Sequence, residues 1–269
     1  MSRHAQPDDE YLEHVRELVD LWALDRISPN DLAPHVQGVL TLWVAVFEQV
    51  KPFQQQSVRV EGIVDHDYQA MACQAERLLA LMGYFGSRKI GLSLREALEL
   101  TDPSLKMWAL VSLLRRYEPV PKDDLEAVAS SHIVRITFWE CLQELEMESL
   151  MPARWSAPQE FAASALSRWL SRPNELNAIP EEIELMRTFP AVDHAGDPME
   201  VYLFRFREYP KPWEPGEGWM AGVAGPYRDG EQIESPWSSF RRWDSMSPED
   251  HFEMLWGGDA CGRPGLHNQ

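Results

Sequence analysis

The chain has 269 residues, of which 44% are hydrophobic and 10% aromatic, so it can bury a sizeable core. Its formal net charge of −18 repels nucleic-acid phosphate and anionic lipid, which disfavours direct binding to either. No stretch approaches the roughly 18 consecutive apolar residues of a membrane span. Residues 1–9 resemble neither a signal peptide nor a transit peptide, so we expect a disordered N-terminal arm and a cytoplasmic location.

Three cysteines, Cys73, Cys141 and Cys261, are odd in number and widely spaced, which argues against a disulfide framework. Cys73 and Cys141 lie in apolar helical patterns, so we expect both to be buried, inert thiols. This use of cysteine also favours the reducing cytoplasm.

The N-terminal part of the chain carries apolar residues at helical spacing. The pattern predicts a first helix over 11–22. Ser28-Pro29 predicts the start of another helix, which is expected to carry Val44 on its apolar face and to end at Pro52. A further helix is predicted over 67–85.

The next segment predicts two consecutive helix pairs. Ser93-Leu94-Arg95-Glu96 has the pattern of a capping box that opens a short helix, and Asp102-Pro103 breaks it. A shift of the chain by 31 residues aligns this unit with the one that follows. The aligned pairs are Leu94 with Leu125, Leu105 with Ile136, Trp108 with Trp139, Val111 with Leu142, Leu114 with Leu145 and Pro121 with Pro152.

Each aligned unit is a short helix, a break and a longer helix. This is the form of a helix-pair solenoid, in which a unit hides its apolar face only against its neighbours. Two amphipathic helix pairs also align this well by accident, so an irregular helical bundle is the alternative. Either arrangement is a mainly α fold, and we expect a helical domain over residues 10–190.

The C-terminal part changes in composition. Ser156-Ala157-Pro158-Gln159 predicts a capped helix over 158–170, and Pro180-Glu181-Glu182 predicts a short helix to about residue 187. Residues 201–206 read as a strand, and 218–227 as its return, with glycines marking a bulge or a close backbone approach. Ser247-Pro248-Glu249-Asp250 opens a last helix. We expect a small Trp-rich β-hairpin segment over 191–256, packed on the helices, and a disordered tail over 257–269.

No specific catalytic or metal-binding motif is present. The sequence lacks a Gly-x-Ser-x-Gly elbow, a phosphate loop, a His-Glu-x-x-His helix and paired Cys-x-x-Cys ligands. Asp193-His194, near Asp197, has the residue types for acid–base work, but the sequence shows no pocket around them. The isolated His132 and His251 are expected to be surface or structural residues. We therefore expect no enzyme, no cofactor and no metal.

Acidic residues gather on the second helix pair. Glu140, Glu144 and Glu148 are spaced by four and are expected to stack on one helix face, and Asp123 and Asp124 begin the preceding helix. Like charges at this spacing destabilise a helix by roughly 0.2–0.5 kcal/mol per pair. A face that keeps them is suited to meet cations, although a solvated helix face has the same pattern. We predict these five residues to contact a partner.

Aromatic residues concentrate after residue 198. Most are expected to form the core of the small β segment, which otherwise has little to bury. Trp213, between Pro212 and Pro215, is the best candidate for an exposed partner contact, since tryptophan anchors interfaces. The concentration comprises Trp213, Trp219, Trp237, Trp243 and Trp256 with Tyr202, Tyr209, Tyr227 and Phe240.

The pairing around Trp108 and Trp139 resembles the HEAT-type helical repeats of bacteria. Residues 174–176, 179–186 and 218–227 resemble the C-terminal part of bacterial HEAT-like proteins, and the resemblance covers roughly residues 93–256. Such proteins are often found beside secreted polymorphic toxins. The resemblance therefore implies an immunity protein.

Taken with the charge, the resemblance leads to one main hypothesis. It is a cytoplasmic immunity-type protein that binds a basic toxin through an acidic helical surface and blocks its active site. A scaffold or adaptor that uses the same helical surface is the first alternative. An enzyme with an unrecognised site, for which Asp193, His194 and Asp197 are the local candidates, is the second.

Overall fold

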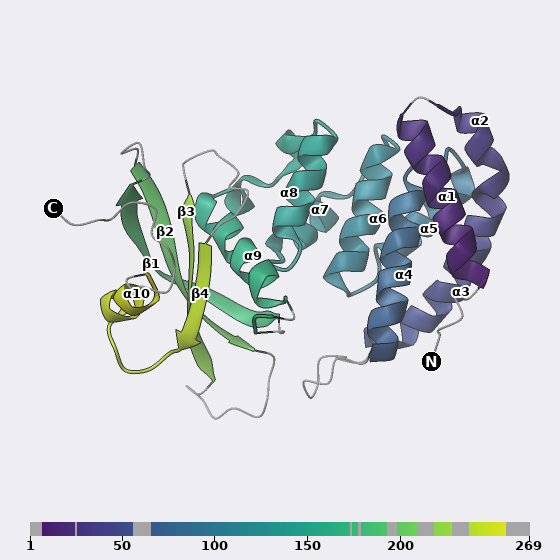
Figure 1. Cartoon of the computed structure of the whole chain (residues 1–269). Coiled ribbons are helices and arrows are strands. Elements are labelled where there is room, and N and C mark those ends of the chain that lie inside the picture. The colour runs from purple at the N-terminus through teal and green to yellow at the C-terminus, as the bar shows by residue number, and fades with distance from the viewer. Residues whose placement is uncertain are drawn as a thin grey trace. The chain divides into compact units, whose positions relative to one another are not determined.

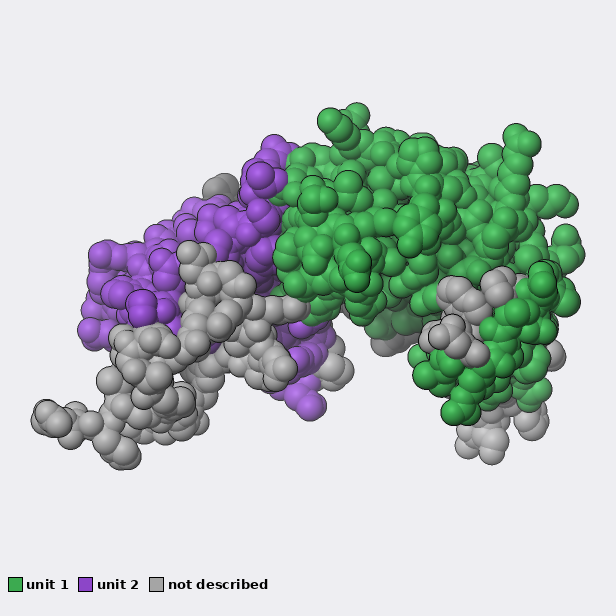
Figure 2. All heavy atoms as spheres, turned by 90° about the horizontal axis from the view of Figure 1, so that it is seen from above, with its two compact units in different colours: residues 1–58, 63–152 green, residues 59–62, 153–269 purple. Residues whose placement is uncertain are grey.

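The fold divides into two compact units, a helical unit and a unit built on a β-sheet (Figure 1). The computed structural model describes residues 7–24, 26–55, 66–172, 174–176, 179–192, 198–208, 218–227 and 237–256. The helical unit holds the described residues up to Pro152, and the sheet unit holds those from Ala153 onward (Figure 2). The predicted mainly α class is confirmed, whereas a solenoid stays a prediction.

The helical unit begins at Pro7, so residues 7–9 of the expected N-terminal arm form the first turn of a helix. Among the described residues, no helix is both long enough and apolar enough to cross a membrane. The elements of this unit are α1 Pro7–Ala23, α2 Pro29–Leu32, η1 Ala33–His35, α3 Val36–Gln55, α4 His66–Met82, α5 Arg88–Ala97, α6 Pro103–Arg115, α7 Lys122–Ser130, α8 Arg135–Glu144 and η2 Glu148–Leu150.

Helix α3 departs from its prediction in two ways. Val44 is 57% exposed, while Val46 and Val50 are buried in its place. Pro52 does not end the helix, which continues through it to Gln55. Proline removes one backbone hydrogen bond, but the last turn is held from outside, because the ring of Phe53 packs 5.4 Å from that of Tyr68 on α4.

The predicted start of α5 is wrong. The helix begins after the N-cap Ser87, so the capping-box pattern at Ser93 lies inside it. Burial of Ile90, Gly91, Leu94 and Ala97 along one stripe outweighs the local signal. The predicted break is confirmed, since the Oδ1 atom of Asp102 accepts hydrogen bonds from the first backbone amides of α6.

The second and fourth helices of the two predicted pairs end in the same way. Tyr117 after α6 and Glu146 after α8 adopt left-handed φ angles of 55° and 56°. In each case the next amide bonds back to the helix, Glu118 to the Leu113 carbonyl and Met147 to the Leu142 carbonyl. This is a Schellman ending built without glycine. Because α8 has 10 residues and α6 has 13, the endings do not keep the 31-residue shift, and the repeat itself stays a prediction.

The sheet unit carries one antiparallel sheet with strand order β1-β2-β3-β4. The two predicted strands are confirmed as β2 and β3, which pair with each other, but the hairpin is the centre of a larger sheet. The elements are η3 Ala153–Trp155, α9 Pro158–Leu170, β1 Pro180–Val192, β2 Pro198–Glu208, β3 Trp219–Tyr227, β4 Trp237–Arg242 and α10 Pro248–Trp256.

The short helix predicted from Pro180 to about residue 187 is wrong, because this segment is edge strand β1. Two glutamates of this segment stand opposite arginines of β2. Glu182 pairs with Arg207 and Glu184 with Arg205, both as register partners and as ion pairs. A partner about 20 residues away along the chain therefore decides the local conformation.

Helices cover both faces of the sheet (Figure 1). Strand β2 is buried on both sides, and its residues alternate between the two. Val201 and Leu203 share one core cluster with Leu255 of α10. On the other face, a Cβ atom on Gly222 would stand 2.8 Å from Leu166 of α9, which confirms the predicted close backbone approach.

Among the side chains of this unit whose burial the structure describes, the fully buried aromatic ones are Tyr202, Phe204 and Phe206. Of the tryptophans after residue 198, Trp219, Trp243 and Trp256 are described and only partly buried, so they flank the core.

The capping box predicted at Ser156 does not form, although α9 spans the predicted residues. The N-cap of α9 is Ala157, and the Ser156 hydroxyl donates to the Ala153 carbonyl. The predicted start of α10 is confirmed, and a capping box forms there, since Asp250 accepts from both the amide and the hydroxyl of Ser247 and its own amide bonds back to that hydroxyl.

Candidate functional site

The predicted partner-binding acids lie on and beside the α7–α8 hairpin. Helix α7 begins after Pro121 and places Asp123 and Asp124 in its first turn, where the helix dipole favours negative charge. The short connection to α8 makes the two helices antiparallel neighbours. The start of α7 and the end of α8 are therefore at the same end of the hairpin.

A buried arginine shapes the opposite end of this hairpin. Arg135 is 2% exposed, and its Nε and Nη2 atoms donate to the carbonyls of Ala129 and Ser130 at 2.7 and 2.9 Å. These are carbonyls at the C-terminus of α7 that have no partner within the helix, so the guanidinium satisfies them. Arg135 thereby ties α7 to the first turn of α8.

The expected stack on one helix face holds for Glu140 and Glu144, which are four residues apart in α8, but is wrong for Glu148. Helix α8 ends at Glu144, and the chain turns at Glu146 before Glu148 opens the separate turn η2. Glu140 is partly buried, whereas Glu144 and Glu148 are exposed. The left-handed conformation of Glu146 was not foreseeable, because glycine or asparagine usually fills that position.

We call Asp123, Asp124, Glu144, Glu146 and Glu148 the acidic end. Within the described part of the chain, none of these five carboxylates forms an ion pair. Glu140 has an interaction partner and is not counted among them.

The negative charge of Glu144, in the acidic end, contributes to the raised pKa of a buried thiol in α8. Burial, followed by the charge of Glu144, raises the pKa of the Cys141 thiol to about 11, and Arg115 only partly offsets this. Cys141 is buried, as predicted, so its thiol stays protonated and unreactive at neutral pH. The same expectation for Cys73 is wrong, since Cys73 is exposed on α4.

Several sequence-predicted candidates lie outside the described residues. They are Trp213, the acid–base candidates Asp193, His194 and Asp197, and Cys261. Across the described ranges, no group of three His, Cys, Asp or Glu side chains is arranged to hold a metal ion.

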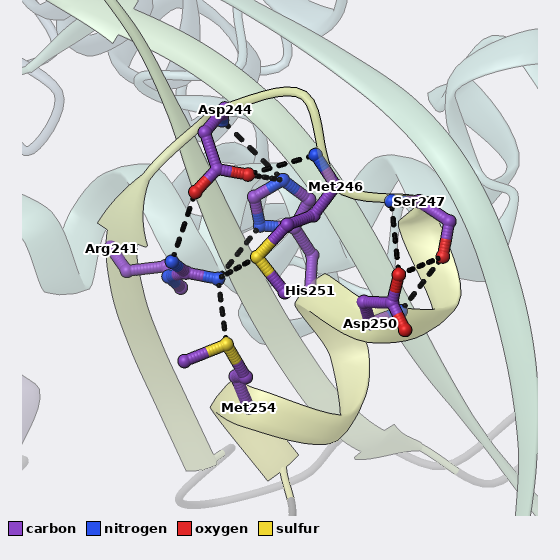
Figure 3. Close-up of polar contacts among 7 residues, drawn as sticks. All are labelled: Arg241, Asp244, Met246, Ser247, Asp250, His251 and Met254. Atoms are coloured by element: carbon purple, nitrogen blue, oxygen red, sulfur yellow. Dashed lines mark hydrogen bonds and ion pairs between the residues drawn. The ribbon is translucent and has the colours of Figure 1, made fainter.

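Sequence reasoning missed a polar cluster in the sheet unit (Figure 3). His251 on α10 is completely buried, and its ring stacks on Trp243 with centroids 4.4 Å apart. Its Nδ1 atom lies 3.3 Å from Nη1 of Arg241, and its Nε2 atom lies 3.4 Å from Oδ1 of Asp244. Arginine only donates, so the contact with Nη1 requires Nδ1 to accept, which is the tautomer that carries the proton on Nε2, beside the Asp244 carboxylate. The longer contact of 3.5 Å, from the backbone N–H of Asp244 to Nε2, belongs to the other tautomer.

The Asp244 carboxylate also accepts a hydrogen bond from Nη2 of Arg241, at 3.1 Å. His251 is thus a satisfied structural histidine, as expected, but not an isolated one. The helix start predicted at Ser247-Pro248 was the one sequence signal for this cluster, because it places His251 in the first part of α10, a few residues after the end of β4.

Comparisons with known proteins add no relative. No family model matches the chain, and neither the curated proteins nor the solved structures contain a match. The likeness to bacterial HEAT-like proteins therefore remains a resemblance of sequence pattern.

Proposed function

We propose that this chain is a non-enzymatic inhibitor that binds a basic protein, in the manner of the immunity proteins that neutralise secreted polymorphic toxins. The acidic end is the proposed contact surface. The observation that carries the proposal is the absence of ion pairs at these five carboxylates, within the described residues, while glutamates elsewhere in the same chain are paired with arginine.

Unpaired carboxylates at one end of a hairpin repel one another in the free protein. A partner that brings lysine and arginine side chains relieves this repulsion and gains steering over a distance of about 10 Å at 0.1 M salt. The net charge of −18 adds a long-range field of the same sign. Toxins that act on nucleic acid or nucleotides have basic clefts, and an acidic surface of this kind would occupy one with a fast association rate.

The surface is also rigid enough to be specific. The α7–α8 hairpin is held by Arg135 at its turn and by the Schellman ending at Glu146. Both devices fix the backbone at and opposite the acidic end. A preorganised surface loses less conformational entropy on binding than a flexible acidic segment would.

The proposal is tested by purifying the tagged full-length protein from its own cells at low and high salt and identifying co-eluting proteins by mass spectrometry. We expect one stoichiometric basic partner whose recovery falls as salt rises and which is toxic when expressed alone. Several unrelated partners would instead favour the scaffold alternative. Recovery of no partner from cells that express the neighbouring genes would overturn the proposal.

A charge-matched pair of variants then tests the surface. One variant combines Asp123→Asn, Asp124→Asn, Glu144→Gln and Glu148→Gln. The control combines Glu17→Gln, Asp20→Asn, Glu48→Gln and Glu99→Gln, four exposed acids elsewhere in the helical unit without an ion pair. Each set removes four negative charges, so the change in total charge is identical.

We expect the first variant to weaken partner binding by about tenfold or more at low salt, chiefly through the association rate, and the control to have a much smaller effect. Equal losses in the two variants would show that only net charge matters, and the acidic end would then be rejected as the contact surface.

A further inference from the structure

Three electron-pair donors surround one nitrogen atom in the sheet unit. Nη1 of Arg241 lies 3.3 Å from the sulfur of Met246, 3.0 Å from the sulfur of Met254 and 3.3 Å from Nδ1 of His251 (Figure 3). All three are acceptors that meet the same positive group. Two of them are thioethers, which are weak hydrogen-bond acceptors and therefore poorly matched to a guanidinium.

Thioether sulfur and imidazole nitrogen are much better matched to a soft metal ion. We propose that Met246, Met254 and His251 form a three-donor site for a soft monovalent ion, Cu(I) or Ag(I), which takes the position of the Arg241 guanidinium. One positive charge replaces another in this exchange, so the neighbouring Asp244 carboxylate keeps a cationic partner.

The surroundings of His251 suit a metal ligand. Its Nε2 atom lies 3.4 Å from Oδ1 of Asp244, so the tautomer with the proton on Nε2 places that N–H beside a carboxylate and presents the lone pair of Nδ1 to the ion. Metal-bound histidines usually donate their second ring N–H to a carboxylate or carbonyl in this way. The stacked ring of Trp243 further fixes the imidazole plane.

The three donors are held by one short segment. His251 and Met254 are three residues apart on α10 and so lie on the same side of that helix, while Met246 precedes it in the loop after β4. The capping box at Ser247 and the buried Leu255 fix α10 against the sheet. Methionine side chains are flexible enough to close on an ion smaller than a guanidinium.

The site is reached from solvent through its arginine side. His251 is completely buried, but Met254 is 56% exposed and the Arg241 side chain is 25% exposed. Rotation of Arg241 outward opens the position between the sulfurs without unfolding α10.

The test uses Ag(I), which has no redox chemistry here, and the full-length protein with Cys73→Ser, Cys141→Ala and Cys261→Ser, because thiols would compete for the ion. Methionine labelled with carbon-13 at its methyl group is followed by NMR. We expect the Met246 and Met254 methyl signals to shift together and to saturate at one equivalent of Ag(I).

Variants make the test specific. Met254→Leu and Met246→Leu, which conserve volume, are each expected to weaken Ag(I) binding by about tenfold or more, and Met199→Leu in the same unit is the matched control with no effect. Arg241→Ala is expected to tighten binding, because the competing guanidinium is gone. Binding unchanged in Met254→Leu, or no shift of these two methyl signals in either the parent or Arg241→Ala, would overturn the proposal.

Discussion

The sheet unit and the acidic end of the helical unit differ in whether their carboxylates are paired with arginine. In the sheet unit, the carboxylates of Glu182, Glu184, Asp244 and Glu249 each meet an arginine. At the acidic end of the helical unit, the described residues provide no such partner for any of the five carboxylates. Acidic side chains therefore link elements of the sheet unit to one another, whereas those at the acidic end stay available to a partner.

Secondary structure explains the difference. Residues opposite one another on paired strands are about 5 Å apart, so a Glu on β1 and an Arg on β2 meet whenever the register aligns them. Helix ends gather residues close in sequence, and here five carboxylates lie near a single lysine, Lys122, at the start of α7. An acid that is paired within the chain cannot serve a partner without first breaking its pair, which makes the unpaired set the better interface candidate.

The ion pairs of the sheet unit depend on a tightly packed sheet. Substitution of Gly222 should disrupt that packing. A Cβ atom there would stand 2.8 Å from both Leu166 and Phe206, and both side chains are completely buried and cannot move away. We expect Gly222→Val to lower the free energy of unfolding by about 1–3 kcal/mol through overpacking. Urea unfolding followed by circular dichroism measures this.

The matched control for that variant is Gly86→Ala in the helical unit, where an added Cβ meets nothing within 4 Å. Its stability should stay within about 0.5 kcal/mol of the parent or rise slightly. Equal losses in Gly222→Val and Gly86→Ala would contradict the close packing of α9 on the sheet.

Glu118, in the helical unit, is paired with Arg95 and Arg116, so it can be compared with the unpaired carboxylates of the acidic end in the same unit. Burial disfavours the charged carboxylate, but the hydrogen bonds and charges of Arg116 and Arg95 outweigh it and hold the pKa of Glu118 below its usual range. We expect Glu118→Gln to cost about 1 kcal/mol at pH 7, toward the low end for charged hydrogen bonds because the side chain is 25% exposed.

The sign of the pH dependence follows from the lowered pKa. The stabilisation by Glu118 is fully present above about pH 4.5, the ordinary value, and is lost as the pH falls through the lower folded-state pKa. The difference in free energy of unfolding between the parent and Glu118→Gln should therefore become smaller as the pH falls below 4.5. A gap that widens below pH 4.5 would show that the arginine pairing is not its cause.

A smaller loss of stability is expected when an ion pair between β1 and β2 is removed. Glu184→Gln removes the ion pair in which Oε2 of Glu184 lies 2.6 Å from Nη2 of Arg205. The free energy of unfolding should fall by about 0.2–1 kcal/mol, because both side chains are partly exposed. Raising the salt concentration should shrink this loss. A loss that persists at 1 M salt would instead indicate a packing role for Glu184.

The smallest effect should have the opposite sign. Glu144→Gln removes one of the unpaired charges of the acidic end, so stability should be unchanged or rise by about 0.2–0.5 kcal/mol. Thermal unfolding at low salt, compared with Glu184→Gln under the same conditions, measures the difference in sign. Destabilisation by Glu144→Gln would mean that this carboxylate has a structural partner after all.

Local signals predicted some elements well and others not at all. Helix α9 spans the predicted residues because Pro158 suits a first helical position, and α10 begins at a capping box that does form. Edge strand β1 was predicted as a helix because its Glu-rich start also fits a helix N-terminus, and the local sequence does not show that β2 pairs with it. The contacts of His251 were missed for the same reason, since Arg241 reaches it from a different element.

The sequence alone determined the mainly helical character, the acidic charge and the positions of α9, β2 and β3, because periodicity, prolines and composition act over a few neighbouring residues. Only the tertiary structure decided that residues 180–192 form a strand, that α8 stops at Glu144, and which carboxylates find an arginine. Those outcomes depend on side chains brought together from distant positions. Pairing across strands and burial against another element outweigh local preferences worth less than about 1 kcal/mol per residue.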